Sequence, residues 1–394
     1  MLQTATFRQV FSSREYRAIW SATVLSDVGD QLARVAVAVI AYERTSSAAI
    51  TAVTYALTFV PALIGGPLLG GLADRFPRRE VMFGCDLARA VLAALMALPS
   101  MPFGVLCALL FAVHLLEAPV RAAYSSVLPQ VFADDRYVTG LSALQMASQL
   151  TRVLGFTVGG IAVAFIQPTT ALLVDAGTFV VAALIVRWGL AARPVPERPQ
   201  GAPARSVLAT GRLIAADRRL RLLVCAAWLA GFYVVPQALA VPYADGLGAG
   251  SAAAGLLMAA APLGTVAGVT VFGRFCTPAL RLTLLGPLAV LTSVPLVLAA
   301  FQPGLVGSIV LWVLIGLFSA YQVTANGEFV RAVPDHLRGQ AVGLAGSGLI
   351  AAQGIGIALG GVLAEQSDPA TAIAVFGVAG VLAGVPIAVA WRSR

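Results

Sequence analysis

Long apolar segments follow one another along almost the whole chain, and this succession limits the fold more than any other feature of the sequence. A helix that spans a bilayer needs about 20 largely apolar residues. Only 11% of the 394 residues are charged and the mean hydropathy is +0.88, whereas a soluble domain carries about 25% charged residues. These charges are too few to cover a water-exposed surface, so we predict an all-α polytopic membrane protein.

Twelve segments are long enough to cross a membrane as helices. An outer-membrane barrel would show short segments of alternating polarity instead. The first segment contains several charges and no clear cleavage site, so we do not expect it to be a removable signal peptide. The twelve segments lie at about 17–42, 48–73, 80–98, 103–125, 138–166, 168–190, 219–244, 250–275, 281–300, 304–327, 335–364 and 367–391.

The arginines predict the orientation of the chain. All 26 basic residues are arginine. With the N-terminus inside, the cytoplasmic segments hold 21 of them and the outer loops hold only Arg44. Positively charged loops face the cytoplasm, so we expect a multi-pass protein of a bacterial cytoplasmic membrane with both termini cytoplasmic. The formal charge of +8 then lies against an anionic inner leaflet and requires no nucleic-acid partner.

Residues suited to catalysis or metal binding are few and scattered. The four cysteines form no CxxC or Cys/His cluster, which argues against a metal site and a disulfide framework. No nucleotide-binding fingerprint or Ser/His/Asp pattern is visible. We therefore expect no enzyme activity, no cofactor and no ATP hydrolysis. Any uphill work would draw on an ion gradient or another chain.

A polar stretch rich in proline and arginine divides the chain into two halves of similar length. We interpret residues 191–217 as a cytoplasmic linker between an N-terminal six-helix bundle at 1–190 and a C-terminal one at 218–394.

The two halves also resemble each other in sequence. Arg75-Phe76 corresponds to Arg274-Phe275 at an offset of 199 residues. Two glycine pairs correspond at an offset of 201, and two proline-containing pairs at an offset of 205. Near-equal offsets indicate a duplicated six-helix unit, which is typical of one transporter architecture.

The loop after the second segment resembles the signature of the major facilitator superfamily, G-x-x-x-D-R-x-G-R-R. Pro77 stands where the signature has its second glycine. The resemblance implies two pseudo-symmetric six-helix bundles around a central cavity. It also implies a cytoplasmic latch in which the aspartate engages the opposing helices, although the arginines could serve only as topology anchors. The matching residues are Gly70, Asp74, Arg75, Arg78 and Arg79.

Other motifs resemble particular branches of that superfamily. Gly155, Gly159 and Gly160 are similar to the fifth-helix glycine motif of its antiporters, with Phe156 where proline is usual. Four further blocks resemble the macrolide-efflux and enterobactin-exporter-like group, which implies a drug:proton antiporter. They are Ser26-Asp27-x-Gly29-Asp30-Gln31, Leu128-Pro129, Asp175-Ala-Gly-Thr-Phe179 and Arg338-Gly339-Gln340.

Ionisable residues inside the predicted spans concentrate in the N-terminal half. Asp27, Asp30 and Arg34 share one face of the first helix at i, i+3 and i+7. A charge within the membrane is costly and is by default a functional hypothesis. We predict that Asp30, with Asp27, carries proton coupling, and that Arg152 or Arg34 holds the acid ionised in one state.

Two more charged pairs lie on neighbouring helices. Glu117 and Arg121 stand at i and i+4 on the fourth helix, where they form either a structural pair or part of the proton pathway. Asp86 and Arg89, at i and i+3 on the third, are interpreted as support for the adjacent loop.

Aromatic and amide residues on the helices expected to line the cavity suit a sizeable amphipathic organic substrate. Each of them could instead face lipid or lie at the interface. The candidates are Tyr42, Tyr55, Phe59, Tyr124, Phe232, Tyr233, Gln237, Trp312, Tyr321, Gln322 and Asn326.

Taken together, the residues and the resemblance predict a secondary-active exporter of an amphipathic compound such as a drug, antibiotic or siderophore-like metabolite. We expect it to use proton antiport and to act as a monomer, with protons, a small molecule and the lipid bilayer as its partners. A gradient-independent lipid flippase, facilitator or receptor on the same scaffold, and a nutrient importer, stay open as alternatives.

Overall fold

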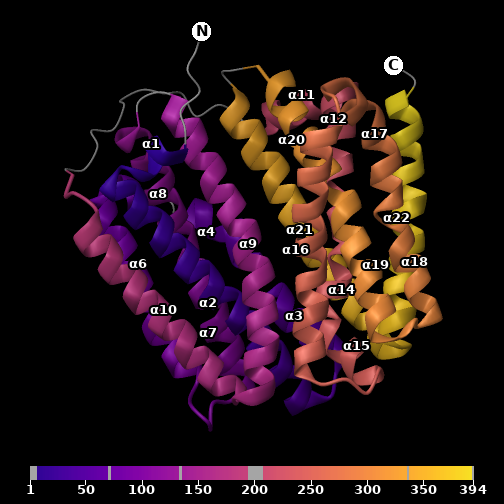
Figure 1. Ribbon diagram of the computed structural model, residues 1–394, viewed down its shortest axis with the longest axis horizontal. Helices are drawn as coiled ribbons and strands as arrows, with labels where there is room; N and C mark the ends of the chain where they lie inside the picture. Colours follow the sequence, from indigo (N-terminus) through magenta and orange to yellow (C-terminus); the bar gives the residue numbers. More distant parts are fainter. Residues whose placement is uncertain (1–6, 70–71, 133–134, 194–206, 335–336, 393–394) are drawn as a thin grey trace. The chain divides into compact units, whose positions relative to one another are not determined.

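The chain folds almost entirely into α-helices, as the computed structural model shows (Figure 1). The residues it describes are 7–69, 72–132, 135–193, 207–334 and 337–392. No strand occurs among these residues, so the all-α prediction is confirmed.

Nine helical stretches in this described part of the chain are long and apolar enough to cross a membrane, and they coincide with the fourth to twelfth predicted segments. The first three segments are helical as well. Charges inside α2 (Arg14–Thr45) and α6 (Arg78–Met96) lower their hydropathy. The second segment is divided into α3 (Ala48–Ala56) and α4 (Val60–Leu69).

Contacts between helices divide the chain into two compact units. Unit 1 comprises residues 1–40 and 60–200, and unit 2 comprises 41–59 and 201–394. Much of the predicted linker, at 194–206, lies outside the described residues. Its last part forms α11 (Val207–Ala216).

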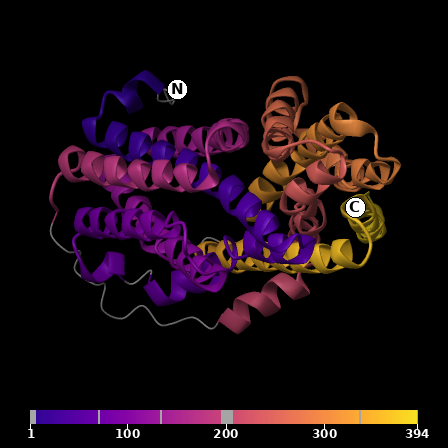
Figure 2. The same ribbon diagram turned by 90° about the horizontal axis from the view of Figure 1, so that it is seen from below.

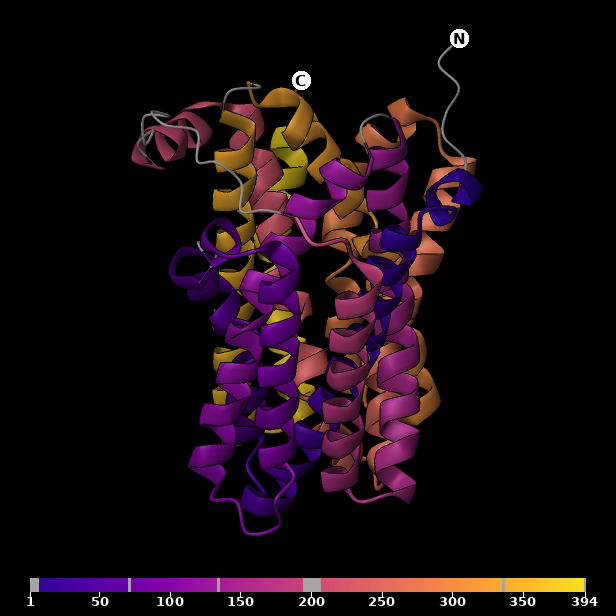
Figure 3. The same ribbon diagram turned by 90° about the vertical axis from the view of Figure 1, so that its left-hand side faces the viewer.

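In unit 1, α6 packs against several helices, among them α10 (Pro168–Gly189) and α8 (Glu117–Val131). The purple and magenta helices of unit 1 run alongside one another in Figure 3. Buried apolar side chains of α2, α6, α8 and α10 form one core cluster, with Ile19, Met82 and Val186 among its members. The remaining helices of the unit are α1 (Phe7–Phe11), α5 (Leu72–Arg75), α7 (Phe103–Leu115), α8 (Glu117–Val131), α9 (Asp135–Phe165) and α10 (Pro168–Gly189).

Several helices of unit 2 begin at residues whose side chains accept hydrogen bonds from the first turn, which satisfies otherwise unpaired N–H groups. Asp217 accepts from Arg219 and Leu220 at the start of α12, and Thr277 accepts from Leu280 at the start of α17. The helices are α12 (Arg218–Trp228), α13 (Ala230–Tyr233), α14 (Val235–Ala238), α15 (Ala240–Gly246), α16 (Ser251–Phe275), α17 (Pro278–Leu291), α18 (Val294–Leu298), the 3₁₀ turn η1 (Ala299–Phe301), α19 (Gly304–Ser319), α20 (Tyr321–Ala332), α21 (Arg338–Gln366) and α22 (Pro369–Arg392).

Unit 2 includes α3, although α3 comes from the first part of the chain. It packs along α21, as Figure 2 shows. Glu365 of α21 accepts hydrogen bonds from the Ser47 hydroxyl at 2.9 Å and the Ala49 N–H at 3.2 Å. Gly361 of α21 lies against Ala49 and Ala52 of α3, where there is no room for a Cβ. A side-chain acceptor and a small residue therefore allow α3 and α21 to pack closely.

Candidate functional site

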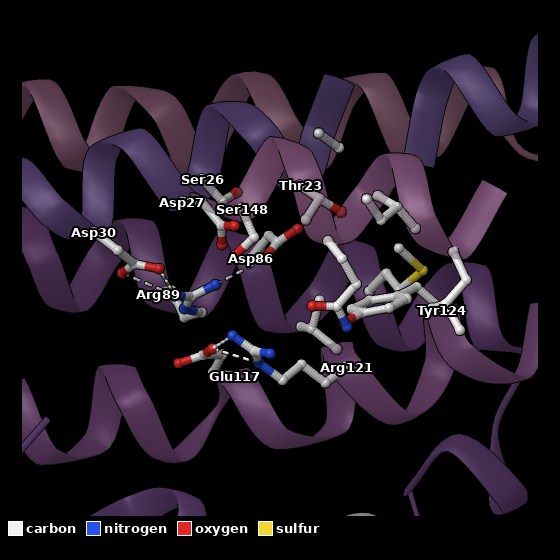
Figure 4. A pocket seen from close by; sticks show the side chains of 16 residues that line it. Thr23, Ser26, Asp27, Asp30, Asp86, Arg89, Glu117, Arg121, Tyr124 and Ser148 are labelled. Carbon is white, nitrogen blue, oxygen red and sulfur yellow. Dashed lines mark hydrogen bonds and ion pairs between the residues drawn. The ribbon is translucent and has the colours of Figure 1, made fainter. Parts of the chain in front are cut away.

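A cavity in unit 1 brings charged side chains of three helices together (Figure 4). Its empty volume is about 740 Å³, part of it open to the surroundings, and α2, α6, α8 and α9 line it. Hydroxyl, amide and aromatic groups complete the lining, including Tyr124. The ionisable side chains are Asp27, Asp30, Asp86, Arg89, Glu117 and Arg121.

Arg89 of α6 lies between two carboxylates. Its Nη2 donates to both oxygens of Asp30 on α2, at 3.1 and 2.9 Å, and its Nη1 lies 3.5 Å from Asp86 Oδ1. The guanidinium carbon lies 4.0 Å from the centroid of the Phe179 ring on α10. All three charged side chains are buried. A buried charge is stable only where it is paired and hydrogen-bonded, and this arrangement meets both conditions.

The interpretation of Asp86 and Arg89 as loop supports is wrong. Both are buried within unit 1, and Arg89 bonds to Asp30 rather than to the loop. Helical spacing shows that the two share a face of α6, but it does not show which neighbour that face meets. The rule that led to Asp30, a charge inside an apolar span, also marks Arg89.

Asp27 is half-buried on the cavity wall and makes no hydrogen bond or ion pair with any described residue. Of the two arginines that we expected beside the acids, Arg34 donates to Gln31 at 3.2 Å. Arg152 is exposed and lies within electrostatic range of Asp27. The guanidinium bonded to Asp30 is instead that of Arg89.

Glu117 and Arg121 form an ion pair within α8, with a distance of 2.5 Å between Arg121 Nη2 and Glu117 Oε1. His114 Nδ1 lies 3.5 Å from Glu117 Oε2. The pair lines the same cavity as Asp27. Its position is compatible with a structural ion pair and with a part of the proton pathway.

The glycine motif of α9 lies against α2. A Cβ on Gly155 would come within 2.6 Å of Gln31 Cβ, and one on Gly159 within 3.1 Å of Leu32 Cα. Gly160 is buried in the same stretch of helix. Small residues let two helix backbones approach closely in membranes, so this motif sets the distance between α9 and the helix that carries the acids.

The residues of the expected latch are only partly described. Gly70 lies outside the described residues, as does the side chain of Asp74 in α5, and Arg75 is exposed. Arg78 donates to the Ser126 carbonyl at 2.9 Å, and Arg79 donates to the Leu190 carbonyl at 3.4 Å. These two arginines therefore join the start of α6 to α8 and to the end of α10.

Among the remaining substrate candidates, three join in one hydrogen-bond network in unit 2. Gln322 donates to the Tyr233 hydroxyl and, at 3.2 Å, to the Ala227 carbonyl, while the Tyr321 hydroxyl donates to the Ala226 carbonyl at 2.7 Å. These contacts occupy their polar groups within the unit.

The other substrate candidates differ in their contacts and in their exposure. Gln237 donates to the Met258 carbonyl at 3.5 Å, and Tyr42 donates to Asp245 at 3.0 Å. Asn326 is exposed and Trp312 is buried. Two aromatic pairs complete the set, Tyr55 with Phe59 and Phe232 with Phe376.

A family model decides the assignment of this helical chain. The model of the Major Facilitator Superfamily matches residues 19–323, and a second match covers 231–394. The chain belongs to the major facilitator superfamily. It is accordingly an integral membrane transporter and not an enzyme. The resemblance of the loop to the superfamily signature is thereby confirmed.

Two relatives have efflux or export in their names. The chain is 27% identical to macrolide efflux protein A of Streptococcus pyogenes over 84 residues, which is 21% of each chain. It therefore matches only about a fifth of that relative's length. It is also 27% identical to the enterobactin exporter EntS of Shigella boydii serotype 4 (strain Sb227) over 389 residues, covering 94% of this chain and 90% of that one.

Solved structures of other transporters share the fold. A bacterial homologue of the lysosomal transporter Spinster, in an inward-facing and occupied conformation, has a TM-score of 0.72 at 15% identity, covering 96% of this chain and 95% of that one. The POT family transporter PepTSo has a TM-score of 0.73 at 15% identity, covering 96% and 98%. At such identities these likenesses establish the fold alone.

Proposed function

We propose that this transporter exports an amphipathic organic compound in exchange for protons. The observation that carries the proposal is the buried Asp30–Arg89–Asp86 group on the wall of a cavity. Ionisable groups inside a membrane mark ion or proton pathways by default. The names of the two relatives support export and an antibiotic- or siderophore-like substrate.

In this proposal Asp30 takes up a proton that arrives through the cavity. The added proton removes the negative charge that faces Arg89 and weakens their ion pair, so the packing of α2 against α6 can change. Alternating access then carries the substrate one way and the proton the other. We place the protein in a bacterial cytoplasmic membrane with both termini cytoplasmic, because the arginines concentrate in the inner segments. We also propose that it acts as a monomer.

Reconstitution in liposomes tests the proposal. Labelled erythromycin and labelled enterobactin serve as probes. Erythromycin is a macrolide, and the second relative is named for enterobactin. With an acidic lumen and a neutral exterior, antiport should accumulate at least one probe above its level at equal pH, and a protonophore should abolish the excess. Accumulation only with an acidic exterior would indicate symport, and gradient-independent movement of labelled lipid would indicate a flippase. Either result would contradict the proposal.

The variant Asp30→Asn tests, in the same assay, whether Asp30 is the acid that couples transport to the proton gradient. It should abolish accumulation driven by the pH gradient but leave exchange of labelled for unlabelled probe detectable, because the pathway survives and only the titrating group is lost. Glu117→Gln should weaken probe binding or stability more than coupling. If Asp30→Asn and Asp27→Asn pump normally while Glu117→Gln does not, α8 carries the proton instead.

A further inference from the structure

Two carboxylates share a single guanidinium beside the cavity of unit 1. Asp30 contacts Arg89 through both of its oxygens, and Asp86 lies 3.5 Å from the other terminal nitrogen of the same group. Side-chain exposures are 3% for Arg89, 8% for Asp30 and 4% for Asp86. With both acids ionised, this group of three carries one uncompensated negative charge.

Other charged groups lie close to these three residues. Glu117 is paired with Arg121. Asp175 accepts from the Thr178 hydroxyl at 3.5 Å, and Asp30, Arg89 and Arg34 all lie within electrostatic range of it. The titratable and charged groups around the three residues are Asp27 and Arg34 on α2, Cys85 on α6, His114 on α7, Glu117, Arg121 and Tyr124 on α8, Arg152 on α9 and Asp175 on α10.

The charges of the group determine how many protons it can take. An arginine in a protein does not lose its proton, and a buried charge without a partner is strongly destabilising. One proton on either carboxylate makes the group neutral and leaves Arg89 paired with the other acid. A second proton would leave the buried guanidinium with no counter-ion. The group is therefore suited to alternate between no added proton and one.

We propose that Asp30, Arg89 and Asp86 form one proton-binding site for a single exchangeable proton, and that Asp86 is as necessary for this site as Asp30. The proton adds to a carboxylate oxygen of either acid and leaves from it, and the two acids titrate as one coupled unit. All three residues line the cavity, which gives the proton a route. The role of this site in transport rests on the proposed export function, but proton binding itself does not.

Removing one acid, and removing one acid together with the arginine, should have opposite effects on proton binding. Asp86→Asn leaves Asp30 and Arg89 as a neutral pair with no charge for a proton to neutralise, and Asp30→Asn does the same for Asp86 and Arg89. The double variant Asp86→Asn/Arg89→Gln leaves Asp30 alone with its negative charge. It should therefore bind a proton again.

Infrared difference spectroscopy of the protein in liposomes, recorded as the pH is lowered, measures this without a substrate. In the wild-type protein we expect a protonated-carboxyl C=O band that Asp30→Asn removes. Asp86→Asn should remove the same band, and Asp86→Asn/Arg89→Gln should restore a carboxyl band. Asp217→Asn, at the N-cap of α12, is the matched control and should keep the wild-type band, because asparagine also caps helices.

A wild-type band in Asp86→Asn, or no carboxyl band in the double variant, would overturn the inference. If Asp86→Asn does not elute as a monodisperse protein, the double variant decides alone. Erythromycin and enterobactin flux is measured on the same preparations. If the wild-type protein moves neither probe, the proposed export function fails while the infrared result still decides the proton site. If it moves one, Asp86→Asn should reduce gradient-driven accumulation to the level of protein-free liposomes.

Discussion

Glu15 shows how a charged side chain outside the spans secures a helix end. At the start of α2, its carboxylate accepts from Arg193 Nη2 at 2.6 Å and from the Ala191 N–H at 2.7 Å. Burial would raise the pKa of Glu15, but the hydrogen bonds from Arg193 and Ala191 outweigh it and hold the pKa below its ordinary value. The interaction ties α2 to the segment that follows α10, and the ionised form of Glu15 is the one that stabilises it.

Glu15→Gln should therefore lower stability only while the glutamate is ionised. Charge-assisted contacts at partly exposed positions are worth about 1 kcal/mol, which corresponds to a melting temperature lower by about 2 °C at neutral pH. Because the folded-state pKa is lowered, this contribution is present above the unfolded-state pKa, near 4.5, and is lost as the pH falls through the folded-state value. Thermal unfolding in detergent across this range measures it.

Glu43→Gln is the matched control, because Glu43 is exposed and makes no hydrogen bond or ion pair within the described part of the chain. It should leave the melting temperature unchanged at every pH. A difference between wild type and Glu15→Gln that persists in acid would mean that Glu15 acts through packing rather than charge.

Close contact between helices depends on glycine at particular positions. On α9, Gly155 lies where a Cβ would come within 3.1 Å of the Val28 carbonyl of α2, in addition to its approach to Gln31. In unit 2, Gly264 of α16 and Gly316 of α19 face each other's helix backbone in the same way. Helix association in a bilayer relies on this kind of packing because lipid chains are as apolar as the side chains.

Gly155→Ala should separate α9 from α2 and destabilise unit 1 by about 1 to 3 kcal/mol, the usual cost of overpacking. The matched control is Gly177→Ala on α10, where a Cβ would meet nothing within 4 Å. Alanine favours a helix over glycine by about 1 kcal/mol, so the control should be neutral or stabilising. Melting temperatures of the two variants in detergent give the comparison. Equal effects would show that α9 and α2 have room to adjust.

The integral membrane character of the whole chain agrees with its surface. Large apolar side chains are exposed on many helices, among them Phe165 at 86%, Leu382 at 68% and Val389 at 63%. A soluble monomer rarely exposes contiguous apolar surface on this scale, whereas a bilayer solvates it. The side chains buried within the units are mostly apolar, and the charged group around Arg89 is among the polar exceptions.

The predicted orientation can be measured with a membrane-impermeant maleimide on intact cells. In an otherwise cysteine-free protein, Gln302→Cys should be labelled, because the arginine distribution places the turn between η1 and α19 outside. A variant that keeps only Cys276 should be labelled only after the membrane is permeabilised. The opposite pattern would reverse the topology and, with it, the direction assigned to transport.

Most of the architecture follows from the order of residues along the chain. Apolar length predicts spanning helices because a bilayer offers no partner for backbone N–H and C=O groups. Helical spacing placed Asp27 and Asp30 on one face and paired Glu117 with Arg121, since residues four apart on a helix are neighbours whatever surrounds them. The loop motif indicated the superfamily, which the family model confirms.

The partner of Asp30 could not be predicted in this way. Arg89 lies 59 residues away in sequence, and local spacing carries no information about which helices become neighbours or how each is rotated. The side-by-side packing of α2, α6 and α10 brings Arg89 to Asp30 and Phe179, and leaves Arg152 exposed. The sequence determined the helices and the charges on them, and only packing in three dimensions determined which charges meet, because a buried charge must find its partner on whichever helix lies beside it.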